Sequence, residues 1–293
     1  MRFLITGGEG RLAAQLARQF SSGHEVHRAS RTSLDVSSRR AVQNYVGELR
    51  PDVILNCAAF NDVDGAEGDA YAALCVNAFA CEYLAEASVA TGAVLVHFST
   101  DFVFDGRSER PYTEEDEPDP VNAYGASKLL GERLATAASR HYVLRLASLF
   151  GNRCANVRSR PSTIEWMCRA LTLGQEVPAF IDRTVAPSYA VDVGHAIEAI
   201  LRLGLPFGVY HCVSSNACTW YDLASYLREL IQAGGTVVPV ARKEASTRAH
   251  RPRYCAMSPA RLAHSGIPMP SWQNAVQRFV GASTHVQQEP ATV

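Results

Sequence analysis

A tyrosine and a lysine four residues apart, Tyr124 and Lys128, form a pair that could transfer a proton. They lie at the start of a helix predicted over residues 122–139, where this spacing places both side chains on one face. An ammonium group beside a phenol stabilises the tyrosinate, which lowers the phenol pKa from its usual value of about 10. Tyr124 could then donate a proton to a carbonyl oxygen, while Lys128 could also hold the ribose of a nicotinamide cofactor. A tyrosine and a lysine at this spacing also occur by chance, so the neighbouring elements are needed to support a catalytic role.

A hydroxyl group at the end of a strand supports the catalytic interpretation. The segment Ser99-Thr100-Asp101 closes a strand predicted over residues 94–99. In a parallel sheet the carboxyl ends of the strands face the ligand. Thr100 and Asp101 are therefore predicted to lie on the ligand side of the sheet.

A glycine-rich segment, GGEGRLA at residues 7–13, follows the first predicted strand and opens the first predicted helix. It fits G-x-G-x-x-A from Gly8 and G-x-x-G-x-x-A from Gly7. Glycines at this place allow a tight turn and let backbone N–H groups approach a pyrophosphate at the helix N-terminus. An ordinary strand-to-helix turn is the alternative. Because strand, helix and position agree, the segment predicts a Rossmann-type dinucleotide site.

The end of the second predicted strand bears on the choice of cofactor. NAD-binding proteins usually place an acidic residue there to hold the ribose 2′-hydroxyl. Here Arg28 and Arg31 occupy this place, and no carboxylate follows before Asp35. A guanidinium group could pair with a 2′-phosphate, or both arginines could be solvated surface residues. The sequence favours NADPH, with NADH possible.

Residues 1–150 alternate short apolar strands with amphipathic helices, which predicts parallel strands joined by crossover helices. The strands carry little polar alternation, as expected where helices cover both faces of the sheet. The fold class is therefore α/β, with a Rossmann-type doubly wound parallel sheet. The predicted strands span residues 2–6, 24–28, 53–57, 94–99 and 142–146, and the helices 11–20, 38–49, 70–91 and 122–139.

The pattern changes beyond residue 150. Residues 151–293 are predicted to form mainly a smaller C-terminal α/β substrate-binding lobe, with the chain returning to the first domain around residues 177–200. Arginines 153, 158 and 160 could receive a diphosphate or lie in a solvated loop. The polar tail, residues 281–293, is predicted to be disordered. The elements expected in the lobe are helices at 163–173, 221–233 and 272–280 and strands near 179–181, 209–212 and 236–240.

Composition excludes several classes of protein. The chain has 293 residues and a net charge of −1, which argues against a duplex-binding nucleic-acid protein. No apolar run approaches the roughly 18 residues that a membrane helix needs, and the N-terminus lacks a secretory apolar stretch. The eight cysteines include no C-x-x-C pair, and no zinc-type Cys/His spacing occurs. We therefore expect a cytoplasmic protein with reduced thiols and no metal.

Taken together, these features resemble the extended short-chain dehydrogenase/reductase superfamily, and most closely the dTDP-4-dehydrorhamnose reductase family. The resemblance covers nearly the whole chain. It rests on RPDVILNCAAFNDVDGAE (50–67), FSTDFVFDG (98–106), PVNAYGASKLLGE (120–132), PSYAVDV (187–193) and RPRYCAMSPARLAHSGIPMPSW (251–272).

The resemblance carries site residues over by position. It implies that Thr100, Tyr124 and Lys128 are the catalytic trio. Together with the residues singled out above, the predicted cofactor site comprises Gly7, Gly10, Arg11, Leu12, Arg28, Arg31, Asp35, Val36, Ala58, Ala59, Phe60, Tyr124 and Lys128. The predicted substrate site comprises Val63, Thr100, Asp101, Phe102, Ser148 and Arg251.

The reaction that the resemblance implies is the NADPH-dependent reduction of a nucleotide-linked 4-keto-6-deoxyhexose in deoxysugar biosynthesis, by a homodimer. Tyr124 would protonate the alkoxide and Thr100 would polarise the carbonyl. The departures from the family pattern cluster on the substrate side. Phe102 stands where a tyrosine is usual, Ser148 where a tryptophan is usual, and Ser162-Thr163 where the family has Asn-Phe. The sequence thus predicts the same chemistry on a related sugar, either that of the family or a different one.

Two other functions remain open at this point. An epimerase or dehydratase of nucleotide sugars keeps its nicotinamide bound, and the RPR…MPSW block speaks against that class. A non-catalytic regulatory subunit, like that of methionine adenosyltransferase, resembles the same family and retains the Y-x-x-x-K pair. Stoichiometric NADPH consumption discriminates the first alternative, and a recovered protein partner without turnover would favour the second.

Overall fold

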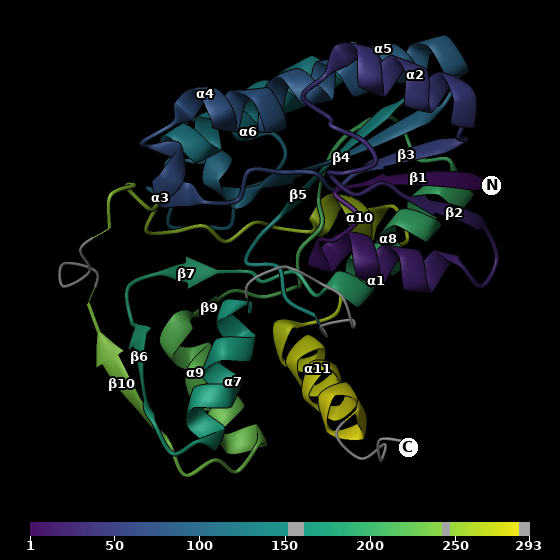
Figure 1. Ribbon diagram of the computed structural model, residues 1–293. Coiled ribbons are helices and arrows are strands. Elements are labelled where there is room, and N and C mark those ends of the chain that lie inside the picture. The colour runs from purple at the N-terminus through teal and green to yellow at the C-terminus, as the bar shows by residue number, and fades with distance from the viewer. Residues whose placement is uncertain (152–160, 242–246, 287–293) are drawn as a thin grey trace.

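A six-stranded parallel sheet forms the larger part of the molecule (Figure 1). The structure is a computed structural model that describes residues 1–151, 161–241 and 247–286. The strand order β2-β1-β3-β4-β5-β8 reverses direction after β1, so the sheet is doubly wound. This confirms the predicted Rossmann-type fold class. The strands are β1 (Arg2–Thr6), β2 (Glu25–Arg28), β3 (Val53–Asn56), β4 (Val94–Thr100), β5 (His141–Leu146) and β8 (Gly208–His211).

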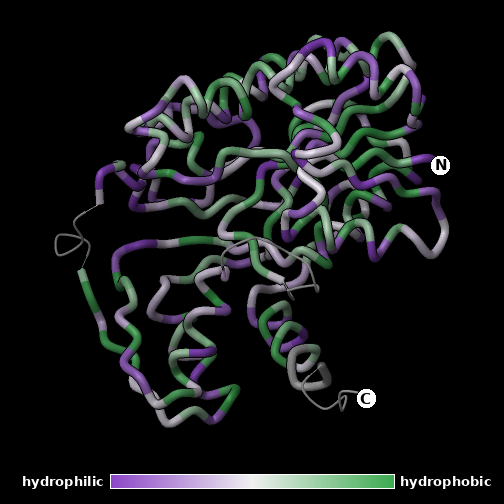
Figure 2. Tube along the Cα trace, viewed as in Figure 1, coloured by the Kyte–Doolittle hydropathy of each residue, from purple (hydrophilic) through white to green (hydrophobic). Residues whose placement is uncertain are grey.

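Helices cover both faces of this sheet because successive side chains of its strands point to opposite sides. On one face Phe3 and Ile5 pack with α1, α8 and α10, and on the other Leu4 packs with α2 and α5. Figure 2 shows the hydrophobic stretches along the central strands. The helices are α1 (Arg11–Phe20), α2 (Arg39–Leu49), α5 (Ala80–Thr91), α6 (Ala123–Ala135), α8 (Ala190–Leu203) and α10 (Ala260–His264).

A smaller lobe lies below the carboxyl ends of the central strands (Figure 1). Strands β6 and β10 pair in parallel, and β7 pairs with β9 in antiparallel orientation. Its own core includes Phe150, Ile164, Trp272 and Phe279. The elements are α7 (Thr163–Thr172), β6 (Glu176–Phe180), β7 (Thr184–Val185), β9 (Cys218–Thr219), α9 (Trp220–Leu230), β10 (Thr236–Val240) and α11 (Trp272–Val286).

The path of the chain between the lobes differs from the sequence prediction. The strand expected at 209–212 in the smaller lobe is β8, which pairs with β5 as an edge strand of the main sheet. The chain returns to the main sheet over α8 and β8, residues 190–211, which overlap the later part of the predicted 177–200, whereas β6 and β7 belong to the smaller lobe. Periodicity identifies an element but not the sheet that it joins.

The long helix expected over residues 70–91 is interrupted. It consists of α4 (Ala70–Leu74), a π-helical turn (Cys75–Phe79) and α5, preceded by a short helix, α3 (Val63–Ala66). Contrary to the sequence expectation, Ala70–Thr91 is long and apolar enough to span a membrane by length and composition. Half of this stretch is buried, and it packs against α2 and α6, as a core helix does.

The C-terminal helix is longer than predicted. Helix α11 continues to Val286, so the polar tail expected to be disordered from residue 281 begins inside a helix. Residues 287–293 lie outside the described residues.

Candidate active site

The predicted catalytic trio comes together where β4 ends and α6 begins. Helix α6 starts at Ala123 because the Asn122 side chain accepts a hydrogen bond from the Gly125 N–H at 2.7 Å. Lys128, one turn into the helix, is 2% exposed and donates from Nζ to the Phe98 carbonyl oxygen at 2.5 Å. The Thr100 side chain lies close enough to the Tyr124 phenol to act on its pKa. The strand end and the helix N-terminus thus bring these three side chains into one cluster.

Gly125 permits the close approach of α6 to the loop that follows β4. A Cβ atom at this position would lie 2.1 Å from the Phe102 carbonyl oxygen, well inside van der Waals contact. The Phe102 and Tyr124 rings lie edge to face, with centroids 6.0 Å apart and an interplanar angle of 82°. The Tyr124 ring is therefore held from the side by Phe102.

The electrostatics of the trio differ from the sequence prediction. Burial raises the pKa of Tyr124 to about 12, and the Thr100 side chain only partly opposes this. Burial lowers the pKa of Lys128 to about 8. The expectation of a lowered Tyr124 pKa was therefore wrong for this structure, because desolvation raises it, the Asp101 charge raises it further, and Lys128 is not among the groups that shift it. Tyr124 is a neutral phenol at neutral pH.

Asp101 lies beside the trio in a buried position. Its Oδ1 atom accepts a hydrogen bond from Thr100 Oγ1 at 3.0 Å, whereas Oδ2 has no hydrogen-bond partner among the described residues. Burial raises the pKa of Asp101 to about 6. The Thr100 hydroxyl is therefore hydrogen-bonded to an acidic side chain and lies near the phenol.

A first cleft of about 610 Å³ opens over the glycine-rich loop. Gly10 is the N-cap of α1 and supplies no side-chain cap, so the first N–H groups of the helix remain available to a ligand. Gly7 has φ +60°, and a Cβ atom there would lie 2.8 Å from the Ala58 backbone. These features fit the pyrophosphate of a dinucleotide. The predicted residues that line the cleft are Gly10, Arg11, Leu12, Ala58, Ala59, Tyr124, Lys128 and Ser148.

Arg11 is engaged by the smaller lobe. Its guanidinium donates to the Gly151 carbonyl oxygen at 2.8 Å and forms an ion pair with Glu165 at 2.6 Å. Both side chains of the ion pair are buried, at 7% and 13% exposed. Glu165 belongs to the first turn of α7, so this contact joins the glycine-rich loop to that helix.

The other predicted cofactor residues lie outside the cleft lining. Arg28 donates from Nε to the Gly8 carbonyl oxygen at 3.0 Å, and Arg31 is exposed. Asp35 accepts hydrogen bonds from Ser37, which lower its pKa, and Val36 is buried. None of these four residues, nor Phe60, is among the residues that line the cleft: Arg28 contacts the loop, Arg31 and Asp35 are exposed, and Val36 is buried. Phe60 is fixed through its backbone by Asn77 of the π-helical turn.

A second cleft of about 390 Å³ adjoins the first and shares Tyr124 and Ser148 with it. Ser148 stands at this junction in a left-handed conformation, with φ 43°. All predicted substrate residues except Thr100 line this cleft, namely Val63, Asp101, Phe102, Ser148 and Arg251. Thr163, which the sequence analysis noted as a departure on the substrate side, also lines this cleft. The lining residues that the sequence did not indicate are Trp166, Met167, Pro178, Ala179, Phe180, Arg183 and Trp220.

Arg251 reaches the second cleft from the C-terminal part of the chain. It forms a bidentate ion pair with Asp64 of α3, at 3.0 and 2.7 Å, and the pairing lowers the pKa of Asp64 to about 2. Asp64 Oδ1 also accepts a hydrogen bond from the Ala249 N–H. Asp64 therefore holds the segment that carries Arg251 against the first domain.

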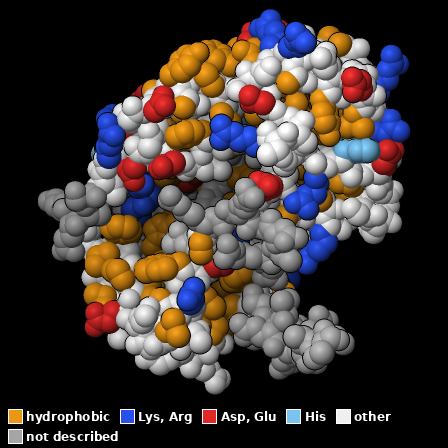
Figure 3. All heavy atoms as spheres, in the orientation of Figure 1, with side chains coloured by type: hydrophobic (Ala, Val, Ile, Leu, Met, Phe, Trp, Pro, Cys, Tyr) orange, Lys and Arg blue, Asp and Glu red, His pale blue; other side chains and the backbone are white. Residues whose placement is uncertain are grey.

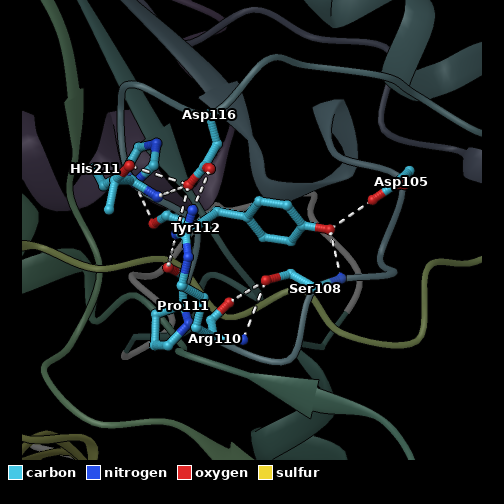
Figure 4. Close-up of polar contacts among 8 residues, drawn as sticks. Asp105, Ser108, Arg110, Pro111, Tyr112, Asp116 and His211 are labelled. Carbon is cyan, nitrogen blue, oxygen red and sulfur yellow. Dashed lines mark hydrogen bonds and ion pairs between the residues drawn. The ribbon is translucent and has the colours of Figure 1, made fainter.

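The segment that carries Arg251, residues 249–258, also packs against the loop that follows β4 (Figure 4). The Tyr112 hydroxyl donates to Asp105 Oδ1 at 2.6 Å, and His211 of β8 contacts the Tyr112 carbonyl oxygen. Gly106 allows the approach, because a Cβ atom there would lie 2.3 Å from the Pro252 side chain. The loop and residues 249–258 are therefore packed as one unit beside the cleft.

Two further predictions concern a diphosphate-binding role of three arginines and the absence of a metal. Arginines 153, 158 and 160 lie outside the described residues. Among the residues that are described, no group of three or more His, Cys, Asp or Glu side chains is placed to hold a metal ion. The absence of a metal stays a prediction.

Comparison with known proteins shows consistent similarities. The family model for the RmlD substrate binding domain matches residues 1–285. The dTDP-4-dehydrorhamnose reductase of Sinorhizobium fredii is 31% identical, with 96% of this chain and 97% of that protein covered. The dTDP-4-keto-6-deoxy-D-glucose reductase of Streptomyces niveus is 35% identical, with 94% and 95% covered. The crystal structure of dTDP-4-dehydrorhamnose reductase from Bacillus anthracis in complex with NADP superposes with a TM-score of 0.90 at 30% identity, covering 96% and 99% of the two chains.

Proposed function

This chain belongs to the dTDP-4-dehydrorhamnose reductase family, and we propose that it is an NADPH-dependent reductase of a nucleotide-linked 4-keto-6-deoxyhexose. The observation that carries the proposal is the meeting of two clefts at Tyr124. The first cleft has the glycine-rich loop that a dinucleotide needs, and the second contains the predicted substrate residues. A proton donor between a cofactor site and a substrate site is the arrangement that ketone reduction requires.

Each residue at the junction of the clefts would have a different role in the reaction, which follows from its position. When bound, NADPH supplies a hydride to the keto carbon of the sugar. Tyr124, a neutral phenol at neutral pH, would donate its proton to the carbonyl oxygen as charge develops there. Thr100 would hydrogen-bond the same oxygen and polarise it. Lys128 would hold the cofactor ribose from its buried place in the first cleft.

The assay for this proposal is the oxidation of NADPH, followed by absorbance, with dTDP-4-keto-6-deoxy-L-mannose generated in situ. We expect rapid oxidation, with one NADPH consumed per sugar reduced. If NADPH binds but is not oxidised with this sugar or with a panel of other keto sugars, the reductase assignment is wrong. The panel is needed because Ser148 departs from the family pattern at the junction of the clefts.

The same assay separates the two other functions. UDP-glucose 4-epimerase from Thermus thermophilus shares the fold, with a TM-score of 0.81 at 20% identity, but this likeness concerns the fold alone. An epimerase or dehydratase would convert the sugar without net NADPH consumption. A regulatory subunit would show no turnover and would be recovered with a protein partner. The homodimer and the cytoplasmic location remain predictions from the sequence.

Replacement of Arg28 by alanine tests the cofactor preference. We expect the Kd for NADPH to rise about tenfold to a hundredfold and the Kd for NADH to change little, because a charged hydrogen bond to a 2′-phosphate is worth about 1.5–3 kcal/mol. Titration of protein fluorescence gives both constants without turnover. Arg40→Ala removes an exposed arginine from α2 and serves as the matched control. An equal loss of affinity for NADPH and NADH would show that Arg28 does not bind the 2′-phosphate.

A further inference from the structure

Trp166 is a large apolar side chain that remains 45% exposed at the second cleft. It lies in α7, and its neighbours Thr163 and Met167 line the same cleft. Leu173, at the end of the same helix, is 61% exposed and lines neither of the two clefts. An exposed tryptophan gives up stabilisation that burial would provide. Its place in the cleft wall, unlike that of Leu173, suggests that a ligand covers it.

Helix α7 holds Trp166 rigidly. Ile164 and Met167 are buried in the core of the smaller lobe. Ser162 and Glu165 form a capping box, with the Ser162 hydroxyl accepting from the Glu165 N–H at 3.2 Å. Glu165 also makes the buried ion pair with Arg11 of the glycine-rich loop. Trp166 is therefore fixed relative to the first cleft and is preorganised for contact with a ligand.

The other lining residues indicate the kind of ligand. Pro178 and Phe180 of β6 supply apolar surface, together with Trp220 at the start of α9. The Arg183 guanidinium lies over the Phe180 ring, 5.7 Å from its centroid. In Figure 3, hydrophobic side chains gather on the smaller lobe beside a hollow. Flat aromatic walls with a nearby cation suit a planar ring that is attached to phosphate.

We propose that Trp166 stacks on the nucleobase of the sugar nucleotide and so determines its affinity. This inference rests on the proposed function, which places the keto carbon at Tyr124 and leaves the rest of the cleft for the nucleotide. A tryptophan face provides a large contact area with a base at a low cost in side-chain entropy. Trp166 contributes binding energy equally before and during the reaction, because it lies on the cleft wall and has no proton to transfer.

The variants Trp166→Ala and Trp166→Phe test this role, with Leu173→Ala as the matched control. For Trp166→Ala we expect a KM for the sugar nucleotide about tenfold higher, in line with the cost of losing one stacked base, and a kcat within about twofold of the parent. The inhibition constant of dTDP, which carries the base without the hexose, rises by the same factor. We expect Trp166→Phe to recover most of the lost affinity for the sugar nucleotide. The KM of Leu173→Ala and the Kd of every variant for NADPH remain those of the parent.

A rise in KM without a rise in the dTDP inhibition constant would overturn the proposal, because the hexose would then be what contacts Trp166. An unchanged KM would overturn it as well. A binding experiment keeps this test separate from the proposed function: dTDP quenches the tryptophan emission of the intact chain, and the quenching is greatly reduced in Trp166→Phe. Quenching by dTDP without any NADPH oxidation would refute the reductase but support the nucleobase subsite at Trp166. NADPH oxidation without quenching would support the reductase and refute that subsite.

Discussion

Replacement of Tyr124 by phenylalanine is expected to lower kcat about a hundredfold or more while the Kd for NADPH stays nearly unchanged. The substitution removes only the hydroxyl group, since the phenylalanine ring can keep its edge-to-face contact with Phe102. General acid catalysis by one positioned side chain contributes about 10²–10⁴-fold. Single-turnover kinetics with saturating NADPH measure the loss directly.

Tyr71→Phe is the matched control for this variant, because Tyr71 is 72% exposed on α4 and lies outside both clefts. We expect its kcat to equal that of the parent. A Tyr124→Phe variant with an unchanged kcat would remove Tyr124 from the role of proton donor. The acid would then have to be sought among its neighbours, with buried Asp101 the first to replace.

Replacement of Gly125 by alanine is expected to destabilise the protein and to disrupt the site at once. The added methyl group would lie 2.1 Å from the Phe102 carbonyl oxygen, so α6 must move away from the loop after β4. Overpacking of this kind costs about 1–3 kcal/mol. The shift separates Tyr124 from Thr100, and a displacement of about 1 Å can cost a hundredfold in rate. Thermal unfolding and kcat report the two effects.

Gly47→Ala supplies a direct comparison, because Gly47 also lies within a helix, α2, and a Cβ atom there meets nothing within 4 Å. Alanine at that position is expected to stabilise the helix by about 0.5–1 kcal/mol and to leave kcat unchanged. If Gly125→Ala retained both the stability and the kcat of the parent, the contact between α6 and the β4 loop could not be what positions Tyr124.

Much of the fold was predictable because its signals are local. Helix α1 spans Arg11–Phe20, as its apolar spacing predicts, and β10 spans Thr236–Val240. The edge strand β8 was assigned to the wrong lobe because its partner β5 lies more than 60 residues earlier in the chain. The π-helical turn at Cys75–Phe79 has no counterpart in apolar periodicity, and within it Asn77 accepts a hydrogen bond from the distant Phe60 N–H.

In the candidate site, too, local features were predictable from the sequence and features set by tertiary packing were not. The glycine-rich loop and the Tyr124–Lys128 pair are short motifs at the starts of predicted helices, so their spacing together with the neighbouring elements indicated them. Trp166 and Arg183 line the second cleft only because the smaller lobe folds against the sheet. The unusual Ser162-Thr163 pair was the one sequence signal near Trp166. The pKa of Tyr124 was predicted in the wrong direction because burial cannot be read from a spacing of four residues.

The central claim is that the protein reduces a keto sugar with hydride from NADPH. The most direct measurement uses NADPH deuterated at both positions of nicotinamide C4, with the 4-keto sugar nucleotide generated in situ and the product examined by mass spectrometry. Hydride transfer from NADPH predicts one deuterium atom on the reduced carbon and equal consumption of NADPH. Unlabelled product formed while the NADPH stays reduced would contradict it.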